Sequence, residues 1–211
     1  VITATEMLWS MTQNERATRA EISDVANAVL DGTDVVMLSE ESAVGEDPIN
    51  VVDTMHNIIA KTEGIYNYDK QYEMPYLDEF DVIQATVTKL ADDLKANGIL
   101  AITSSGKSAL KMSRYRPRTP IFTFTHKKKV LNSLTAIWGV EPIGIIKEAQ
   151  ASKMFQKMLK SLDEIGKLKK DGLYVATVGY PVGMPGSTNT IKILTPSEIE
   201  YYLNFKDKKA K

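Results

Sequence analysis

The sequence predicts an α/β protein whose sheets are mostly parallel. Strand patterns alternate with helix patterns along nearly the whole chain, and such alternation implies right-handed crossovers between parallel strands. The run "DVVML" at 34–38 is apolar throughout, which is typical of a parallel strand covered on both faces. Polar loops follow several of these strands, and open α/β sheets bind ligands at the carboxyl ends of their strands.

The N-terminal part is expected to contain strands and helices in alternation. β-branched residues at 1–5 predict a strand, and a helix is expected near "EMLWSMT" at 6–12. Apolar residues at helical spacing predict a helix over 18–30, before the strand at 34–38. The polar loop "SEESAVGEDP" leads to an amphipathic helix in "INVVDTMHNIIAKTEGIY", and Pro48 suits the first turn of that helix.

The segment 67–80 separates two parts of the chain. It is rich in tyrosine and acidic residues, contains a proline and shows no periodicity. This composition indicates a linker. We therefore expect a first domain at 1–66, a linker at 67–80 and a second domain at 81–211.

The second domain is expected to be a three-layer α/β/α structure with a mostly parallel sheet. A helix is predicted in "DVIQATVTKLADDLKANG" and strands in "GILAIT", "PIFTFT" and "VEPIGII", with helices after the first and second strands. A lysine-rich helix is expected over 150–168. The last two strands, "LYVATVG" and "NTIKIL", have no helix between them, so we expect them to pair as a hairpin.

Composition excludes several classes of function. The 211 residues carry a formal net charge of −1, so no global attraction to nucleic acid or to a membrane surface is expected. No apolar run approaches the roughly 20 residues of a membrane helix. The absence of cysteine excludes thiolate chemistry and suits a cytoplasmic protein, and a histidine-rich metal site is not expected from 2 histidines. Because Val1 begins inside a predicted strand, we expect that the chain was cut from a longer protein.

The motif "TSSGKS" ends a predicted strand and opens a predicted helix. Its hydroxyl groups, its backbone N–H groups and the helix dipole can all point at an anion, and Gly106 allows close approach of the backbone. It is not a Walker A sequence, because the leading glycine and the spacer are missing. A serine-capped helix after a polar turn explains the same residues equally well. The candidate anion-binding residues are Thr103, Ser104, Ser105, Gly106, Lys107 and Ser108.

Two further motifs leave alternatives open. The loop "GYPVGMPGSTNT" at 179–190 is either a wide hairpin turn or, if the strand order places it beside the first loop, part of one enclosure around a sugar phosphate. The motif "SRYRPR" at 113–118 contains arginines that suit phosphate recognition, but structural ion pairs at a helix C-terminus are the favoured interpretation.

Polar residues also follow the two N-terminal strands. "ATE" at 4–6 ends the first strand, and "MLSEES" at 37–42 follows the second. The carboxylates of the second motif can hold a metal or an ammonium group, or cap the next helix, and spacing does not decide between these roles. Two strands with polar carboxyl ends resemble part of the active face of a (β/α)₈ barrel.

Several of these strings together resemble the pyruvate kinase family, from Val1 to about Leu194. "ATEML…RATRAEISDVANAVLDGTDVVMLSEESAVGEDP" is similar to the stretch that spans the last two barrel strands of that family. "TSSGKSALKMSRYRPRTPI" is similar to the phosphate loop of its C-terminal domain, and "NTIKI" to its final strand. The resemblance implies an incomplete (β/α)₈-barrel segment followed by an α/β/α regulatory domain.

The resemblance also implies an activity. The family transfers phosphate between phosphoenolpyruvate and ADP, giving pyruvate and ATP, with Mg²⁺ and K⁺, and its enzymes are usually homotetramers. Thr5 matches a threonine near the substrate, and Ser39 and Glu41 match the nucleotide-side rim of the barrel. Arg19 and Glu21 match a subunit contact. The six residues of the "TSSGKS" loop match the site for the phosphate of a phosphosugar or nucleotide effector.

Departures from the family pattern limit what the resemblance implies. Glu40 and Ser42 stand where the family usually has Gly and Thr. No arginine matches the one that clamps a second effector phosphate, so a monophosphate effector, or none, is as plausible as a bisphosphate. The catalytic lysine, the acidic pair that holds the metal and the lid match nothing here. We therefore expect an inactive fragment that binds no metal, with a stand-alone phosphosugar-binding or assembly module as the alternative.

Overall fold

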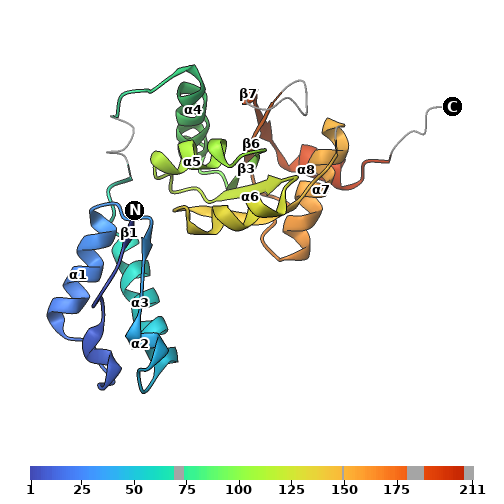
Figure 1. Ribbon diagram of the computed structural model, residues 1–211. Coiled ribbons are helices and arrows are strands. Elements are labelled where there is room, and N and C mark those ends of the chain that lie inside the picture. Colours follow the sequence, from blue (N-terminus) through green and yellow to red (C-terminus); the bar gives the residue numbers. More distant parts are fainter. Residues whose placement is uncertain (69–73, 149, 180–187, 207–211) are drawn as a thin grey trace. The chain divides into compact units, whose positions relative to one another are not determined.

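The computed structural model describes residues 1–68, 74–148, 150–179 and 188–206 (Figure 1). The chain divides into two compact units, which we call unit 1 (Val1–Asn67) and unit 2 (Tyr68–Lys211). The predicted fold class is confirmed, because unit 1 has the parallel strand pair and helices of a barrel segment and unit 2 has a mostly parallel α/β sheet. No helix in the described ranges is long and apolar enough to cross a bilayer.

Unit 1 is held together by helices packed on a short parallel strand pair. β1 (Ile2–Thr3) pairs with β2 (Val35–Val36), and α1 (Arg19–Leu30) and α3 (Pro48–Glu63) cover the pair. Pro48 occupies the first turn of α3, and the Asp47 side chain accepts a hydrogen bond from the Asn50 amide at 3.0 Å. The buried core of the unit consists of Met7, Leu8, Met11, Val25, Val51 and Met55.

Two local predictions in unit 1 are wrong. Residues 6–12 do not form a regular helix, and a single 3₁₀ turn, η1 (Trp9–Thr12), occurs instead. Thr5 and Glu6 have φ values of 73° and 53°, and a residue in this left-handed conformation cannot lie within a right-handed helix. The loop at 39–48 contains a short helix, α2 (Glu40–Ala43).

Unit 2 is built on a five-stranded sheet with the order β5-β4-β3-β6-β7. All neighbours are parallel except β6 and β7, which form the predicted antiparallel hairpin. Because β3 lies between β4 and β6, the loops that follow these three parallel strands leave the same edge of the sheet. The strands are β3 (Gly98–Ile102), β4 (Ile121–Thr125), β5 (Val140–Ile145), β6 (Tyr174–Gly179) and β7 (Thr188–Leu194).

The helices of unit 2 follow the predicted order with one addition. They are α4 (Glu79–Asp93), α5 (Lys107–Arg114), α6 (Lys128–Ser133), the 3₁₀ turn η3 (Leu134–Ala136), α7 (Ala151–Glu164) and α8 (Pro196–Leu203). The sequence analysis did not predict α8. Its signal was present, because Thr195 and Glu198 form a capping box and Pro196 occupies the first helical position.

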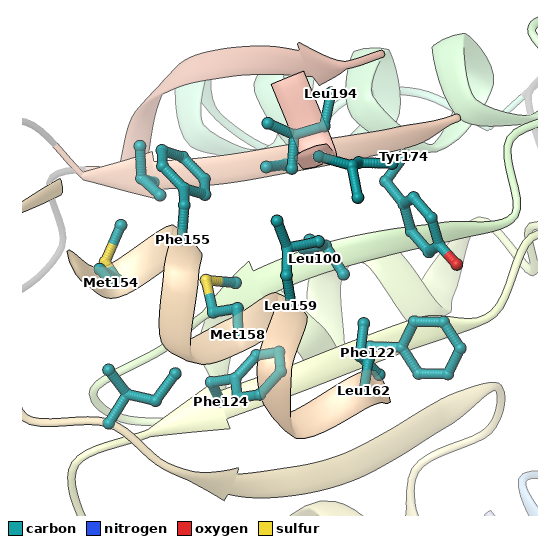
Figure 2. Close-up of a cluster of buried hydrophobic side chains, with 14 residues drawn as sticks. Leu100, Phe122, Phe124, Met154, Phe155, Met158, Leu159, Leu162, Tyr174 and Leu194 are labelled. Carbon is teal, nitrogen blue, oxygen red and sulfur yellow. The ribbon is translucent and has the colours of Figure 1, made fainter. Parts of the chain in front are cut away.

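The sheet of unit 2 separates two hydrophobic clusters and thus forms the middle of three layers. Ile99 and Ala101 of β3 face the cluster completed by α4 and α5, whereas Leu100 faces the cluster completed by α7 and α8. Figure 2 shows the second cluster, where α7 projects a row of side chains onto the sheet. That row consists of Met154, Phe155, Met158, Leu159 and Leu162.

We predict that Leu159→Ala destabilises unit 2 by about 2–5 kcal/mol, because it leaves a cavity under α7. Leu159 is fully buried. The matched control is Leu110→Ala on α5, whose side chain is 57% exposed, and a change within about 0.5 kcal/mol is expected there. Urea unfolding followed by circular dichroism measures both values. Equal effects of the two substitutions would contradict the packing described.

Candidate functional site

The loop Thr103–Ser108 connects the carboxyl end of β3 to the first turn of α5, as predicted. Its turn is closed from within, because the buried Gly106 amide donates a hydrogen bond to the Thr103 hydroxyl at 2.9 Å. The Thr103 amide in turn donates to the Phe124 carbonyl at 2.9 Å, which fixes the loop to β4. The loop is therefore held in one shape by the sheet below it.

Gly106 is the N-cap residue of α5 and adopts a left-handed conformation with φ 86°. The alternative of a serine-capped helix is wrong, because no side chain caps this helix. A Cβ at Gly106 would lie 3.4 Å from Leu134 and 3.8 Å from Val130, so α6 and η3 pack directly against the loop. The first backbone N–H groups of α5 lack a side-chain acceptor and need one from elsewhere.

The side chains of the loop divide into an outer and an inner set. Ser105 and Lys107 are exposed and Ser104 is half-buried, so these three can reach a ligand. Thr103 and Ser108 are buried, and the Ser108 hydroxyl lies 3.3 Å from that of Thr188, the first residue of β7. The structure thus brings the six predicted residues together, with the inner two as support.

The second predicted loop, 179–190, lies mostly outside the described residues. Its ends are described: Gly179 pairs with Thr188 across the β6–β7 hairpin. The strand order places β6 next to β3, and the contact between Ser108 and Thr188 ties the end of this loop to the first turn of α5.

A basic run after β4 was missed by the sequence analysis. The exposed residues 126–129 read "HKKK" and follow the strand next to β3 at the same sheet edge. They lead into α6, which packs against Gly106. The run was visible in the sequence, but only the strand order shows that it leaves the sheet beside the loop.

The motif "SRYRPR" is structural, as favoured from the sequence. Arg114 donates to the Asp81 carboxylate at 2.7 Å, and the Tyr115 hydroxyl donates to the same oxygen at 2.8 Å. Burial, the hydrogen bond to Asp81 and the negative charge of Asp81 raise the pKa of Tyr115 to about 12. The Arg116 guanidinium lies 4.9 Å from the centre of the Trp138 ring.

In unit 1, Glu41 uses its carboxylate to fix the backbone. Its side chain is 1% exposed, and its two oxygens accept hydrogen bonds from the amides of Leu8 at 3.3 Å and Ser39 at 2.7 Å. The structure thus shows a role for Glu41 that the sequence analysis did not name, which is to hold two backbone amides. Thr5, Ser39, Glu40 and Ser42 are exposed.

Glu21 also forms hydrogen bonds within unit 1. It forms a capping box with Thr18 at the start of α1, and it accepts hydrogen bonds from the amide and hydroxyl of Ser10 at 2.6 Å and 2.5 Å. Partial burial raises the pKa of Glu21, but the hydrogen bonds from Ser10 and Thr18 outweigh it and leave the pKa below the ordinary value. Arg19, the neighbouring interface candidate, is exposed.

Among the described residues, no group of three or more His, Asp or Glu side chains is placed to hold a metal ion. Both oxygens of Glu41 are bonded to backbone amides, so this carboxylate is not turned outward to a cation.

Comparison with known proteins gives a consistent result for both units. Residues 81–194 match the family described as "Pyruvate kinase, alpha/beta domain", and residues 1–52 match "Pyruvate kinase, barrel domain". A pyruvate kinase of Lactobacillus delbrueckii subsp. bulgaricus is 40% identical over 199 residues, which cover 92% of this chain and 34% of that relative. One of Clostridium acetobutylicum is 41% identical over 197 residues, covering 92% of this chain and 42% of the relative.

A solved structure has a similar fold. The crystal structure of a pyruvate kinase from Cryptosporidium parvum superimposes with a TM-score of 0.83 at 32% identity, covering 92% of this chain and 39% of that chain. The chain therefore spans between 34% and 42% of the length of these relatives.

We predict that Thr103→Val destabilises unit 2 by about 1–3 kcal/mol, because it leaves the buried Gly106 amide without its acceptor. Thr103→Ser keeps the hydroxyl and serves as the control, with a smaller loss expected. Urea unfolding of both variants measures the difference. A loss for Thr103→Ser as large as that for Thr103→Val would show that the hydrogen bond is not the cause.

We predict that Glu21→Gln weakens the acid dependence of unit 1 stability. The pKa of Glu21 is lowered in the folded state, so its contribution is fully present above the ordinary value of 4.5 and is lost as the pH falls through the lowered value. Thermal unfolding between pH 3 and 7 tests this, with Glu40→Gln, an exposed carboxylate, as control. An unchanged slope in Glu21→Gln would contradict the assignment.

Proposed function

This chain belongs to the pyruvate kinase family, and from that premise we propose that it is the regulatory end of an enzyme that transfers phosphate from phosphoenolpyruvate to ADP. Unit 2 binds an effector through the loop Thr103–Ser108, and nothing is transformed there. The parent enzyme uses Mg²⁺ and K⁺, acts in the cytoplasm and assembles as a homotetramer. Its domains in this chain are 1–66, the linker 67–80 and 81–211.

The geometry at Gly106 carries the effector-binding part of the proposal. The left-handed cap residue, itself buried, turns the backbone into α5 at the carboxyl edge of the sheet, and no side chain caps that helix. The positive end of the helix dipole favours an anion at that place. Exposed Ser105 and Lys107 add a donor hydroxyl and a positive charge. A phosphate group of a phosphosugar or a nucleotide has the charge and acceptor oxygens that this loop requires.

The roles of the unit 1 residues belong to the same proposal. In the whole enzyme, Thr5 lies near the substrate, and Ser39 and Glu41 line the nucleotide side of the barrel rim. Glu41 does so by shaping the backbone, since both of its oxygens bond to amides. Arg19 and Glu21 lie at a contact between subunits, with Glu21 acting through the cap of α1.

We further propose that the 211-residue chain alone has no kinase activity. Phosphoryl transfer requires metal and cationic charge on the transferring group. The relatives are more than twice as long, and the residues here contribute a rim to the active site without the cationic centre that the reaction needs. The alternative is a stand-alone phosphosugar-binding or assembly module, and titration with phosphosugars and AMP distinguishes a binding role from an assembly role.

We predict saturable binding of at least one of ribose 5-phosphate, AMP and fructose 1,6-bisphosphate in isothermal titration calorimetry. Lys107→Glu is expected to weaken that binding about tenfold or more, because it replaces the attractive charge by a repulsive one. Lys89→Glu, an exposed lysine on α4, is the control and should leave the affinity unchanged. Absence of binding by all three ligands would contradict the effector site and favour an assembly role.

The same preparation tests the absence of kinase activity. A coupled assay should detect no phosphoenolpyruvate-dependent formation of ATP when Mg²⁺ and K⁺ are supplied. Measurable turnover, abolished by Thr5→Ala, would refute this part of the proposal and leave the effector-binding part to stand on the calorimetry.

A further inference from the structure

Four charged residues join α4 to α5, and we call them the clamp: Asp78, Asp81, Lys111 and Arg114. Lys111 donates to both oxygens of Asp78 at 2.8 Å and lies 3.8 Å from Asp81. Arg114 donates to Asp81 at 2.7 Å. Both acids are three residues apart on one chain segment, and both bases are three residues apart on α5, so two neighbouring turns are paired.

The clamp also holds the segment 75–78, which leads into α4. The second guanidinium nitrogen of Arg114 (Nη2) donates a hydrogen bond to the Pro75 carbonyl at 3.1 Å. The Leu77 amide donates one to the Asp81 carboxylate at 2.9 Å. Asp78 caps α4 by accepting the Asp81 amide at 2.7 Å. Residues 75–78 are therefore fastened to α5 by side chains that α5 itself supplies.

The helix α5 begins at the phosphate loop and ends at the clamp. It has eight residues, with Gly106 as its N-cap and Arg114 as its last residue. Lys111 and Arg114 lie in its second half, where Lys111 also contacts the Phe80 ring at 5.5 Å from the ring centre. A change at the first turn of such a short helix reaches its last turn within a single rigid element.

We propose that the clamp couples occupancy of the phosphate loop to the chain segment 75–78, which lies near the start of unit 2 and leads into α4. This inference rests on the proposed function, because it requires that the loop binds an anion. An anion at the first turn is attracted by the helix dipole and by amides that no side chain caps, and it fixes the position of that end of α5. With α5 fixed, Lys111 and Arg114 stay against the acids, and the segment is held.

Asp81 makes the clamp sensitive to the position of α5. Its side chain is fully buried, and Arg114 and Lys111 are its cationic neighbours. One of its oxygens has no hydrogen-bond partner among the described residues, although it lies within ion-pair distance of Lys111. A buried carboxylate that loses its partners is strongly destabilised, so displacement of α5 and release of the segment occur together.

The test uses the whole chain and hydrogen–deuterium exchange of the backbone amides of residues 76–82. Each of ribose 5-phosphate, AMP and fructose 1,6-bisphosphate is added in turn, and calorimetry establishes which of them binds. With a ligand that binds, we expect exchange in this segment to slow by about fivefold or more. Residues far from the clamp on α8 serve as an internal reference.

Two mild variants break the clamp from opposite sides. Lys111→Gln removes one cation whose side chain is 20% exposed, and Asp78→Asn removes its partner's charge while keeping a good N-cap residue for α4. Both are expected to bind the ligand within twofold of the wild-type affinity but to lose most of the ligand-induced protection. Lys89→Gln, which removes an exposed ion pair on the same helix, should keep the full protection.

The outcomes separate the two proposals. Binding without protection of residues 76–82 in the wild type overturns the clamp and leaves the effector site intact. Protection that persists in both Lys111→Gln and Asp78→Asn also overturns the clamp. Absence of binding by every ligand overturns the effector site, and the clamp as a coupling device with it.

Discussion

At Gly106 the backbone adopts a left-handed φ of 86°, and this bend allows α5 to start directly at the carboxyl end of β3. The amide of the same residue is held by the Thr103 hydroxyl, and Leu134 of η3 lies within van der Waals contact of where a Cβ would be. A residue with a side chain is strained in that conformation. The start of the helix, the exposure of Lys107 in its first turn and the contact between Ser108 and Thr188 all follow from this bend.

Charged side chains stabilise the two units in different ways. In unit 1, the buried Glu41 and the half-buried Glu21 accept hydrogen bonds from backbone amides, so single acids organise short, irregular segments that two-residue strands cannot hold. In unit 2, acids and bases pair between helices, and the sheet supplies the rigid frame. The loop that we assign to an effector lies where that frame meets its exposed edge.

Local patterns in the sequence were sufficient for most of unit 2. A lysine-rich helix was predicted over 150–168, where α7 lies, and the missing helix between the last strands predicted their hairpin. Partners distant in sequence were not predictable in the same way. Asp81 and Arg114 are 33 residues apart, as are Leu8 and Glu41, and no local period connects them. The loop residues were found because they are contiguous, whereas their division into outer and inner side chains depends on tertiary contacts.

Unit 2 does not end where its family match ends. The match stops at Leu194, but Ile199 of α8 is fully buried in the cluster shared with α7, and Gln156 of α7 donates to the Phe205 carbonyl at 2.8 Å. A version of this protein that ends at the family boundary would expose apolar side chains of α7 and would be prone to aggregation. Expression work on the domain should therefore keep the chain through residue 206.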